Sequence, residues 1–445
     1  MKSTTNTRLP AGLPLPNMAQ TLIFWRRPLA YLEHCHRLYG PCFTLRPMGH
    51  PPLVFLSNHE EIKALIAAPP DCLHPGAGAA AITPIVGSTS FMIHDENRHL
   101  HGRKAILPSL HAKAIQQHTH SLQTIVRRHV ASWPRDTTTA LYPRLRALTL
   151  EIILERIFTA DSLIIDGRLD ALRERLLAML TVTSSTILSV PLLRHDPRRG
   201  TWERFQHNRQ AVNQLLYELI DTPRDPAAPT SDLHMVFLAA RNPDGSPPTR
   251  EQIRDNIMSI LLAGHETTAS QLAWAFQLLA HNPRVLARLT EEIDHGESDE
   301  YLTATIQETL RHRPVFLFTI PRAVARPIEI GGWRYRPPTR LLGCIYLVHH
   351  DPRIYPDPQA FRPERFLDRP PQPHLWLPWG GGRRRCPGLH MTMLEMKTVL
   401  RSVLSGATVL PAARRMERPL WRSVIVTPHA GSRVVLSERI VTTSC

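Results

Sequence analysis

The spacing of hydrophobic and polar residues divides the chain into segments with different predicted secondary structure. Near the start, residues 42–57 ("CFTLRPMGHPPLVFLS") predict two short strands around a turn that contains glycine and proline. From about residue 94 to 313, apolar residues recur at helical spacing, which predicts a run of helices. Proline-bearing stretches at residues 189–200 and 221–232 interrupt this run.

The last third of the chain predicts β-structure again, together with one helix. Residues 319–348 have strand-like composition, a helix is expected from about Pro387, and residues 422–437 predict a terminal hairpin. We find no internal repeat and no long linker. The pattern predicts a mainly α fold with small β-sheets (α+β) in a single domain, residues 1–445. Its parts are a β-rich N-terminal part to about 93, a helical core over about 94–313, and a β-containing part over about 314–445.

Composition supports a folded protein in a reducing compartment. Hydrophobic residues make up 42% of the chain and charged residues 20%, which allows a sizeable core and argues against general disorder. The six cysteines are scattered without the spacing of a zinc site, in a chain too long to need a disulfide framework. The N-terminal 25 residues contain neither a signal-peptide core nor a spanning segment. We therefore expect a cytoplasmic protein without a membrane anchor.

The net charge of +15 raises the question of a negatively charged partner. Nucleic acid is disfavoured, because aromatic residues make up only 6% of the chain and no basic run alternates with stacking aromatics. An anionic membrane surface and an acidic protein partner remain open.

One cysteine lies in an unusual local context, the stretch "WLPWGGGRRRCPGLH" from Trp376 to His390. Pro387 suits the first position of a helix, which makes Cys386 the predicted N-cap, where a thiolate would be stabilised by the helix dipole. The glycines allow the backbone to approach a flat ligand, and arginine can pair with its anionic edge. These features are typical of a haem iron held by a cysteine thiolate. A buried structural cysteine is the alternative.

Two further segments are informative only in combination with this one. Glu308 and Arg311 are three residues apart in a predicted helix and can form an ion pair, although such pairs usually lie on the surface. A long helix is predicted from about Thr249 to His281, and it contains "LLAGHETTAS". Gly264 and Thr267 permit a local distortion there. An ordinary buried helix with a polar patch would explain the same pattern.

The pattern aromatic-x-x-Gly-x-Arg-x-Cys-x-Gly, formed by Trp379, Gly382, Arg384, Cys386 and Gly388, resembles the haem-binding loop of the cytochrome P-450 monooxygenases. Trp379 stands where that family usually has phenylalanine. The other motifs follow in the family's order, so that the resemblance covers nearly the whole chain. It implies the cytochrome P-450 fold, a triangular prism with a long central helix over the haem.

The resemblance also implies roles for individual residues. Glu308, Arg311 and Arg365 match a structural network beneath the haem, and Ala263, Gly264, Glu266 and Thr267 match the oxygen-binding groove, with Glu266 and Thr267 catalytic. His99, Arg103, Arg322 and Arg384 match haem-propionate contacts. The substrate pocket is expected to include Ser259, Leu262, Phe316, Phe318, Val424 and Ile425. Residues 74–92 are expected to form a mobile lid, and a loop at 181–193 to gate entry.

The implied activity is insertion of one oxygen atom from O2 into a hydrophobic small molecule. The expected cofactor is haem b (iron protoporphyrin IX), with NAD(P)H electrons supplied by a separate ferredoxin or flavodoxin and its reductase. The expected substrate is a polyketide, macrolide or terpenoid of secondary metabolism, or a fatty acid, and the expected state is a monomer. The alternatives are a peroxide-using peroxygenase, a non-oxygenating haem-thiolate enzyme, a haem sensor and a nucleic-acid binder.

Overall fold

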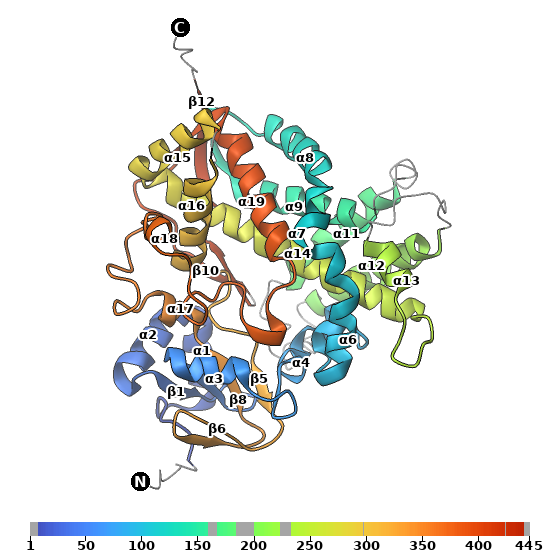
Figure 1. The fold of residues 1–445 in the computed structure, drawn as a ribbon, viewed down its shortest axis with the longest axis vertical. Helices are drawn as coiled ribbons and strands as arrows, with labels where there is room; N and C mark the ends of the chain where they lie inside the picture. The colour runs from blue at the N-terminus through green and yellow to red at the C-terminus, as the bar shows by residue number, and fades with distance from the viewer. Residues whose placement is uncertain are drawn as a thin grey trace.

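The structure is a computed structural model, and it describes residues 8–158, 167–183, 200–222, 233–296, 298–422 and 424–439. Helices form the larger part of the molecule (Figure 1). The five-stranded sheet lies at the N-terminal end of the view, whereas β12 lies at the opposite end, near the C-terminus. The mainly α fold with small sheets is therefore confirmed.

The α-helices are α1 (Asn17–Arg26), α2 (Pro28–Tyr39), α3 (His59–Ala67), α4 (Pro75–Gly78), α5 (Thr83–Val86), α6 (Glu96–Ile106), α7 (Ala112–Gln116), α8 (Thr119–Ala131), α9 (Leu141–Ile157), α11 (Arg168–Thr183), α12 (Thr201–Asp221), α13 (Leu233–Ala239), α14 (Arg250–Ala280), α15 (Pro283–His295), α16 (Glu300–His312), α17 (Ile345–His349), α18 (Arg365–Asp368) and α19 (Leu389–Leu404). The short 3-10 helices are η1 (Ala80–Ile82), η2 (Phe91–Ile93), η3 (Pro108–Leu110) and η5 (Gly382–Arg384).

The strands form four small sheets. The five-stranded sheet has the order β1-β2-β8-β5-β3 and contains β1 (Cys42–Leu45), β2 (Leu53–Leu56), β3 (Leu73–His74), β5 (Arg322–Val324) and β8 (Arg340–Gly343). The other sheets are formed by β6 (Ile328–Ile330) with β7 (Trp333–Tyr335), by β10 (Pro419–Arg422) with β11 (Ile425–Pro428), and by β4 (Thr138–Ala140), β12 (Arg433–Glu438) and β9 (Ala407–Pro411). The predicted early hairpin is confirmed, since β1 and β2 pair antiparallel with Cys42 opposite Leu56.

The predicted terminal hairpin is wrong. β11 pairs with β10, which precedes it, and β12 pairs with β9 and β4 instead of with β11. The turn at Gly431, which has a φ of 82°, directs the chain away from β11. The N-terminal part also contains more helix than its predicted β-rich character implied, because α1, α2 and α3 fall within it.

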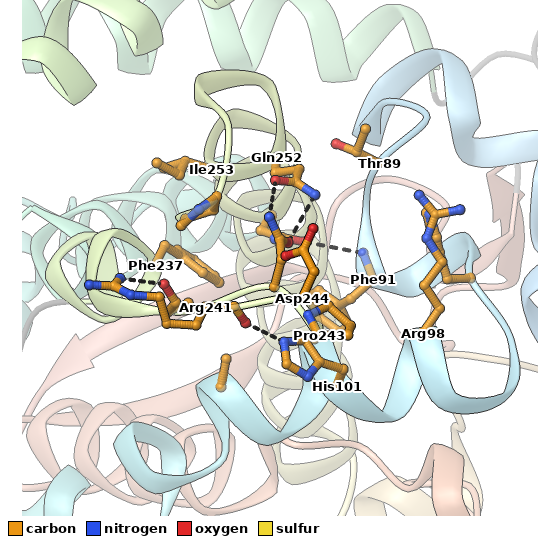
Figure 2. A pocket seen from close by; sticks show the side chains of 17 residues that line it. Thr89, Phe91, Arg98, His101, Phe237, Arg241, Pro243, Asp244, Gln252 and Ile253 are labelled. Atoms are coloured by element: carbon orange, nitrogen blue, oxygen red, sulfur yellow. Dashed lines mark hydrogen bonds between the residues drawn. The ribbon is translucent and has the colours of Figure 1, made fainter. Parts of the chain in front are cut away.

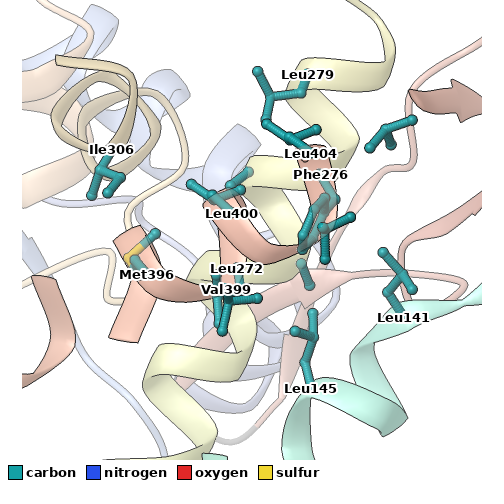
Figure 3. Close-up of a cluster of buried hydrophobic side chains, with 14 of the residues drawn as sticks. Leu141, Leu145, Leu272, Phe276, Leu279, Ile306, Met396, Val399, Leu400 and Leu404 are labelled. Carbon is teal, nitrogen blue, oxygen red and sulfur yellow. The ribbon is translucent and has the colours of Figure 1, made fainter. Parts of the chain in front are cut away.

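The central helix α14 positions the site and agrees closely with the prediction. Thr249 caps its start, and Gln252 completes a capping box, because each side chain bonds the other residue's backbone N–H. The helix packs against α9, α12, α16 and α19. Leu272 and Phe276 of α14 lie against Val399 and Leu400 of α19 in the largest core cluster (Figure 3). The core therefore fixes α14 and α19 relative to each other.

Candidate functional site

The loop that carries Cys386 is shaped by glycines and leads into α19. Gly380 and Gly382 have φ values of 64° and 61°, which favour glycine strongly over other residues. The backbone N–H of Cys386 donates to the carbonyl of Trp379 at 2.8 Å, which closes the loop. Trp379 is half-buried and meets the ring of Trp376 edge-on, with centroids 6.5 Å apart.

The predicted start of the last long helix needs a correction. Pro387 and Gly388 form a turn, so that α19 begins at Leu389 and Gly388 is its N-cap. Cys386 is therefore not the N-cap. Its thiol is half-buried, and burial raises its pKa, whereas the backbone N–H of Gly388 and the nearby charge of Arg103 lower it. The turn thus supplies the stabilising N–H that a cap position would have supplied, and a bound metal would complete the deprotonation of the thiol.

Three arginines that the sequence singled out converge on this loop. Arg322 of β5 is buried, and its Nη1 donates to the carbonyl of Leu65 at 2.8 Å. Arg384 donates to the carbonyl of Met92 at 3.0 Å and pairs with Asp95 at 2.9 Å. Burial and the charge of Arg384 lower the pKa of Arg322 to about 10, and burial, with a smaller effect of Arg103, lowers that of Arg384 to about 10. These charges are therefore close enough to repel one another.

This cluster carries an excess of positive charge. Within the described residues, Asp95 is the one carboxylate that forms an ion pair with any of the three arginines. Buried charges are normally paired, so the remaining two positive charges call for anionic groups. The two propionates of a haem would supply them.

His99 adds an unpaired polar atom to the same place. Its Nδ1 bonds the carbonyl of Phe91 at 3.0 Å, and its Nε2 is buried beside Arg383 without a hydrogen-bond partner among the described residues. Burial and the charge of Arg384 lower its pKa to about 4, so that the ring is neutral at pH 7. Because Nδ1 donates to Phe91, the neutral ring leaves a lone pair on Nε2, and His99 could bond a propionate only with a proton on Nε2. The lone thiol and the surplus guanidinium charge are the features that fit an anionic haem.

Helix α14 carries Glu266 and Thr267, the two residues predicted to be catalytic. The Thr267 hydroxyl donates to the carbonyl of Ala263 at 2.7 Å, one turn earlier, and Ala263 is exposed. Gly264 was expected to permit a local distortion of the helix, but the structure shows a steric role for it. A Cβ at this position would lie 2.9 Å from Cγ1 of Ile153 on α9. The glycine allows α9 and α14 to approach closely. His265, between Gly264 and Glu266, is fully buried.

The carboxylate of Glu266 is largely buried between basic groups from two other elements. Nη2 of Arg146, on α9, lies 3.4 Å from Oε1 of Glu266. Burial raises the pKa of Glu266, whereas the charges of Arg146 and of Arg422 on β10 lower it. Both arginines also lie over the ring of Tyr142, each with its guanidinium carbon 5.9 Å from the ring centroid. Glu266 can therefore hold or release a proton depending on how closely these arginines approach.

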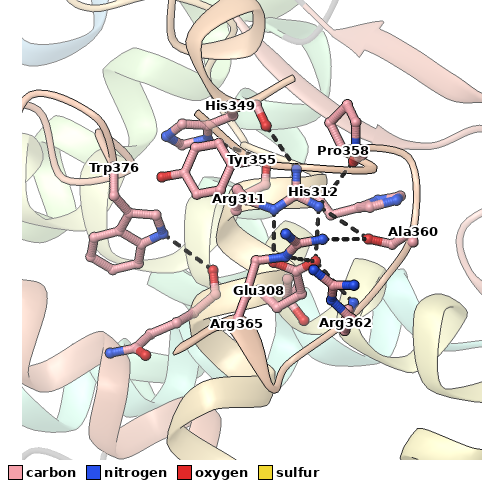
Figure 4. Close-up of polar contacts among 12 residues, drawn as sticks. Glu308, Arg311, His312, His349, Tyr355, Pro358, Ala360, Arg362, Arg365 and Trp376 are labelled. Atoms are coloured by element: carbon pink, nitrogen blue, oxygen red, sulfur yellow. Dashed lines mark hydrogen bonds and ion pairs between the residues drawn. The ribbon is translucent and has the colours of Figure 1, made fainter. Parts of the chain in front are cut away.

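The structure also brings Glu308, Arg311 and Arg365 into contact (Figure 4). Oε2 of Glu308 accepts from Nε of Arg311 at 2.7 Å, and Oε1 accepts from Nη2 of Arg311 at 2.8 Å and from Nε of Arg365 at 3.1 Å. Glu308 and Arg311 are fully buried. Arg311 also donates to the carbonyl of His349 at 2.7 Å. Arg311 further donates to the carbonyls of Pro358 and Ala360, so the network connects α16 both to the end of α17 and to the irregular segment that follows it.

The six residues expected in the substrate pocket have different surroundings. Ser259 is fully buried, and its hydroxyl bonds that of Ser90 at 2.6 Å. Phe318 is half-buried in an aromatic cluster with Phe24 and Phe55. Val424 is exposed and Ile425 is buried, while Leu262 and Phe316 are half-buried against core clusters.

The segment 74–92, which was expected to form a mobile lid, makes close contacts with neighbouring parts of the fold. A Cβ on Gly78 would lie 1.6 Å from the carbonyl oxygen of Pro321, and the Thr89 hydroxyl donates to Asp255 at 2.7 Å. The Asp95 carboxylate also accepts from the backbone N–H groups of Gly76 and Ala77. Of the expected gating loop, residues 184–193 lie outside the described residues.

A separate pocket of about 490 Å³ lies between α6, α13 and the start of α14 (Figure 2). Its polar walls include Arg98, Arg241 and Gln252, and Phe91 forms part of its lining. None of the six residues expected in the substrate pocket belongs to its lining.

Sequence reasoning missed two kinds of site residue. Asp95 anchors Arg384, and Arg146 and Arg422 flank Glu266, but each lies far along the chain from its partner. No local spacing connects them. Among these three residues, Asp95 alone had a signal in the sequence. It stands at the start of the helix that carries His99 and Arg103.

Comparisons with known proteins agree with this geometry. A family model described as Cytochrome P450 matches residues 8–434. The chain is 33% identical over 444 residues to the putative cytochrome P450 135B1 of Mycobacterium bovis, covering 98% of this chain and 92% of that protein. It is also 33% identical to the putative cytochrome P450 135A1 of Mycobacterium tuberculosis, covering 98% and 97%.

Solved structures show the same fold. The retinoic acid-bound cyanobacterial CYP120A1 superimposes with a TM-score of 0.85 at 21% identity, covering 98% of this chain and all of that one. The haem domain of cytochrome P450DA superimposes with a TM-score of 0.82 at 19% identity, covering 97% and 99%.

Proposed function

The chain belongs to the cytochrome P450 family of haem-thiolate monooxygenases, and from this membership we propose that it hydroxylates or epoxidises a hydrophobic small molecule. The proposed substrate classes are polyketides, macrolides, terpenoids and fatty acids. The observation that carries the proposal is the convergence of Arg103, Arg322 and Arg384 around the Cys386 loop with one carboxylate between them.

The proposed cofactor is haem b, held between α14 and the Cys386 loop. Sγ of Cys386 is the iron ligand, and His99, Arg103, Arg322 and Arg384 bind the propionates. Trp379, Gly382, Gly388 and Ala263 would border the ring. Gly264, expected in the same set, instead faces Ile153 of α9. When bound, haem supplies the iron at which O2 is activated, with electron density donated by the thiolate.

The chain itself must supply protons. Inserting one atom of O2 into a C–H bond consumes two electrons and two protons and releases the other atom as water. Glu266 and Thr267 are adjacent on the helix that faces the proposed haem. If the Glu266 carboxylate leaves Arg146, it can take up a proton from water. The resulting carboxylic acid can give this proton to the Thr267 hydroxyl, which releases its own proton toward the oxygen site, and such transfers contribute about 10²–10⁴-fold to rates.

We predict that Glu266→Gln lowers kcat about 100-fold and that Thr267→Val lowers the yield of product per NAD(P)H consumed, because both interrupt this proton path. The measurement is product formed against NAD(P)H oxidised. Thr268→Val is the matched control, since Thr268 is buried and its hydroxyl lies a longer 3.4 Å from the carbonyl of Gly264. A Thr267→Val enzyme with the same product yield as Thr268→Val would exclude the proposed role of Thr267.

Electrons are proposed to come from a separate acidic ferredoxin or flavodoxin and its reductase. Arg383 and Arg385 are exposed on either side of the inward-facing Arg384, next to the proposed iron ligand. Positive charge at this position, together with the net charge of +15, would steer an acidic partner to the loop.

We expect Arg383→Glu to raise the KM for a ferredoxin by about fivefold at low salt and to weaken the salt dependence of turnover, because a steering charge is reversed. The kcat at saturating ferredoxin should stay unchanged. Arg334→Glu, at an exposed position on β7, is the matched control. Equal salt dependence in the two variants would contradict docking at the Cys386 loop.

The substrate classes rest on the apolar character of the residues expected in the pocket. Phe316, Phe318, Leu262 and Ile425 offer large hydrophobic contacts, and the retinoic acid-bound neighbour illustrates that this fold can accommodate a long apolar molecule. The test is titration of the purified haem protein with representatives of the four classes, followed by product analysis. We expect at least one class to change the haem absorption and to yield a product heavier by one oxygen atom. If compounds of none of these classes change the spectrum, the proposed substrate classes are wrong.

A further inference from the structure

The carboxylate of Asp95 is the point at which segment 74–92 meets the proposed haem site. Its Oδ1 accepts from the backbone N–H of Gly76 at 2.6 Å, and its Oδ2 accepts from that of Ala77 at 2.8 Å. The same Oδ1 accepts from Nη2 of Arg384 at 2.9 Å. One largely buried side chain therefore holds both the start of the segment and an arginine that is proposed to bind a propionate.

Arg384 holds the other end of the segment. Its Nη1 donates to the carbonyl of Met92 at 3.0 Å, and its Nη2 donates to the carbonyl of His94. The two ends also touch each other, because a Cβ on Gly76 would lie 2.4 Å from the carbonyl oxygen of His94. The segment is thus a loop whose ends are joined through Asp95 and Arg384.

The start of the segment also lies against β5, the strand that begins with Arg322. Helix α4 packs on β5 and on η2. A Cβ on Gly78 of α4 would overlap the carbonyl oxygen of Pro321, the residue before Arg322. Two of the arginines that are proposed to bind haem are therefore in contact with, or adjacent to, the residues that close the loop.

The charges at this place balance only when two propionates are added. Arg103, Arg322 and Arg384 are close enough to repel one another, and Asp95 is the one carboxylate of the described residues that pairs with any of them. In protein that has lost its haem, this repulsion opposes the pairing of Arg384 with Asp95. Two propionates would make three carboxylates for three guanidinium groups. Haem binding therefore favours the arrangement in which Asp95 and Arg384 join the ends of the segment.

We propose that Asp95 is a positioning residue that couples haem binding to the closure of segment 74–92, an inference that rests on the proposed cofactor. Coupling between two equilibria is reciprocal, so the closed segment should slow the release of haem. The far part of the segment is held on α14, where the backbone N–H and the hydroxyl of Thr89 donate to one oxygen of Asp255, at 2.8 and 2.7 Å. Loosening this contact should speed haem release only while Asp95 is present.

The experiment measures the rate of haem transfer from the full-length ferric protein to an excess of apomyoglobin, in a double-mutant cycle of Asp95→Ala and Thr89→Val. We expect Asp95→Ala to speed haem release about tenfold, within the range of ordinary coupling between sites. Thr89→Val, which removes one bond to Asp255 at nearly constant volume, should speed release about threefold in the wild type. It should have no further effect in the Asp95→Ala protein.

Glu96→Gln is the matched control. Glu96 is the next carboxylate in the chain and also contacts the segment, through Nε2 of His74 at 2.9 Å, but it is half exposed and, within the described part of the chain, pairs with none of the three arginines. Because exposed ion pairs contribute little, its haem release should stay within about twofold of the wild type. Asp95→Asn keeps the shape and one acceptor oxygen, and it takes the place of Asp95→Ala if that variant does not fold.

The carbon monoxide spectrum separates loss of coupling from loss of ligation. The Asp95 carboxylate bonds Gly76, Ala77 and Arg384, and none of these bonds involves Cys386, so the reduced spectrum of each variant should equal that of the wild type.

Equal haem release from the Asp95 variant and from Glu96→Gln would overturn the coupling. An effect of Thr89→Val that is the same in both backgrounds would also overturn it, because the segment would then act as a steric barrier without Asp95. A wild type that binds no haem would show that the proposed cofactor is wrong, and the coupling with it. That failure appears in the absorption spectrum before any rate is measured, so the two failures are distinguishable.

Discussion

Glu308→Ala is expected to lower the free energy of unfolding by about 3–5 kcal/mol, because it leaves the buried guanidinium of Arg311 without its counter-charge. Arg311 is fully buried, and both oxygens of Glu308 accept hydrogen bonds from it. The loss would also release Arg365 and the backbone N–H of Arg362, which donates to Glu308 at 2.9 Å. A loss of this size is a large fraction of the stability of an ordinary domain, about 5–15 kcal/mol.

Urea unfolding, followed by far-ultraviolet circular dichroism, measures this effect. Glu300→Ala is the matched control, since Glu300 lies at the exposed start of the same helix and should change stability by no more than about 0.5 kcal/mol. Arg365→Met should have an intermediate effect, because Arg365 makes one of the several bonds to Glu308. Equal midpoints for Glu308→Ala and Glu300→Ala would show that the network contributes little to stability.

The parts of the fold that local sequence determines were predicted best. The ends of α14 followed from Thr249 and from the length of the apolar pattern, and the structure places its start and end within one residue of the prediction. The strands β1 and β2 followed from alternation around a turn. Such features depend on residues close together in the chain, whose spacing is visible in the sequence.

Features that depend on distant partners were predicted poorly. The pairing of β12 with β9 and β4 competes with the nearer β11, and the sequence contains no signal that ranks these partners. The start of α19 was misplaced because proline at the first helical position is only a preference, and here Pro387 belongs to the preceding turn.

In the candidate site, too, residues that are close in sequence were predicted and residues that act from distant segments were not. Cys386, Arg384 and the two glycines that bend the loop are neighbours in sequence, and their spacing singled them out. Asp95 and Arg146 balance the charges of Arg384 and Glu266 from other helices. Their roles follow from the folded charge distribution, which a single sequence does not display.

Cys386→Ala is expected to remove thiolate ligation completely. Alanine keeps the small size of the side chain and the backbone hydrogen bond to Trp379, so the loop should remain folded. The four propionate contacts proposed above do not involve the thiol, and haem could still bind through them. Monooxygenase activity should be lost, because no other cysteine lies in this loop to replace the ligand.

The most direct test of the haem-thiolate site is the absorption spectrum of the dithionite-reduced protein under carbon monoxide. It compares the wild type, Cys386→Ala and Cys72→Ala, a control in which another partly exposed cysteine is removed. We predict a strongly red-shifted Soret band in the wild type and in Cys72→Ala, and its absence in Cys386→Ala. A Soret band at the position typical of histidine-ligated haem in the wild type, or a red-shifted band that survives in Cys386→Ala, would contradict ligation by Cys386.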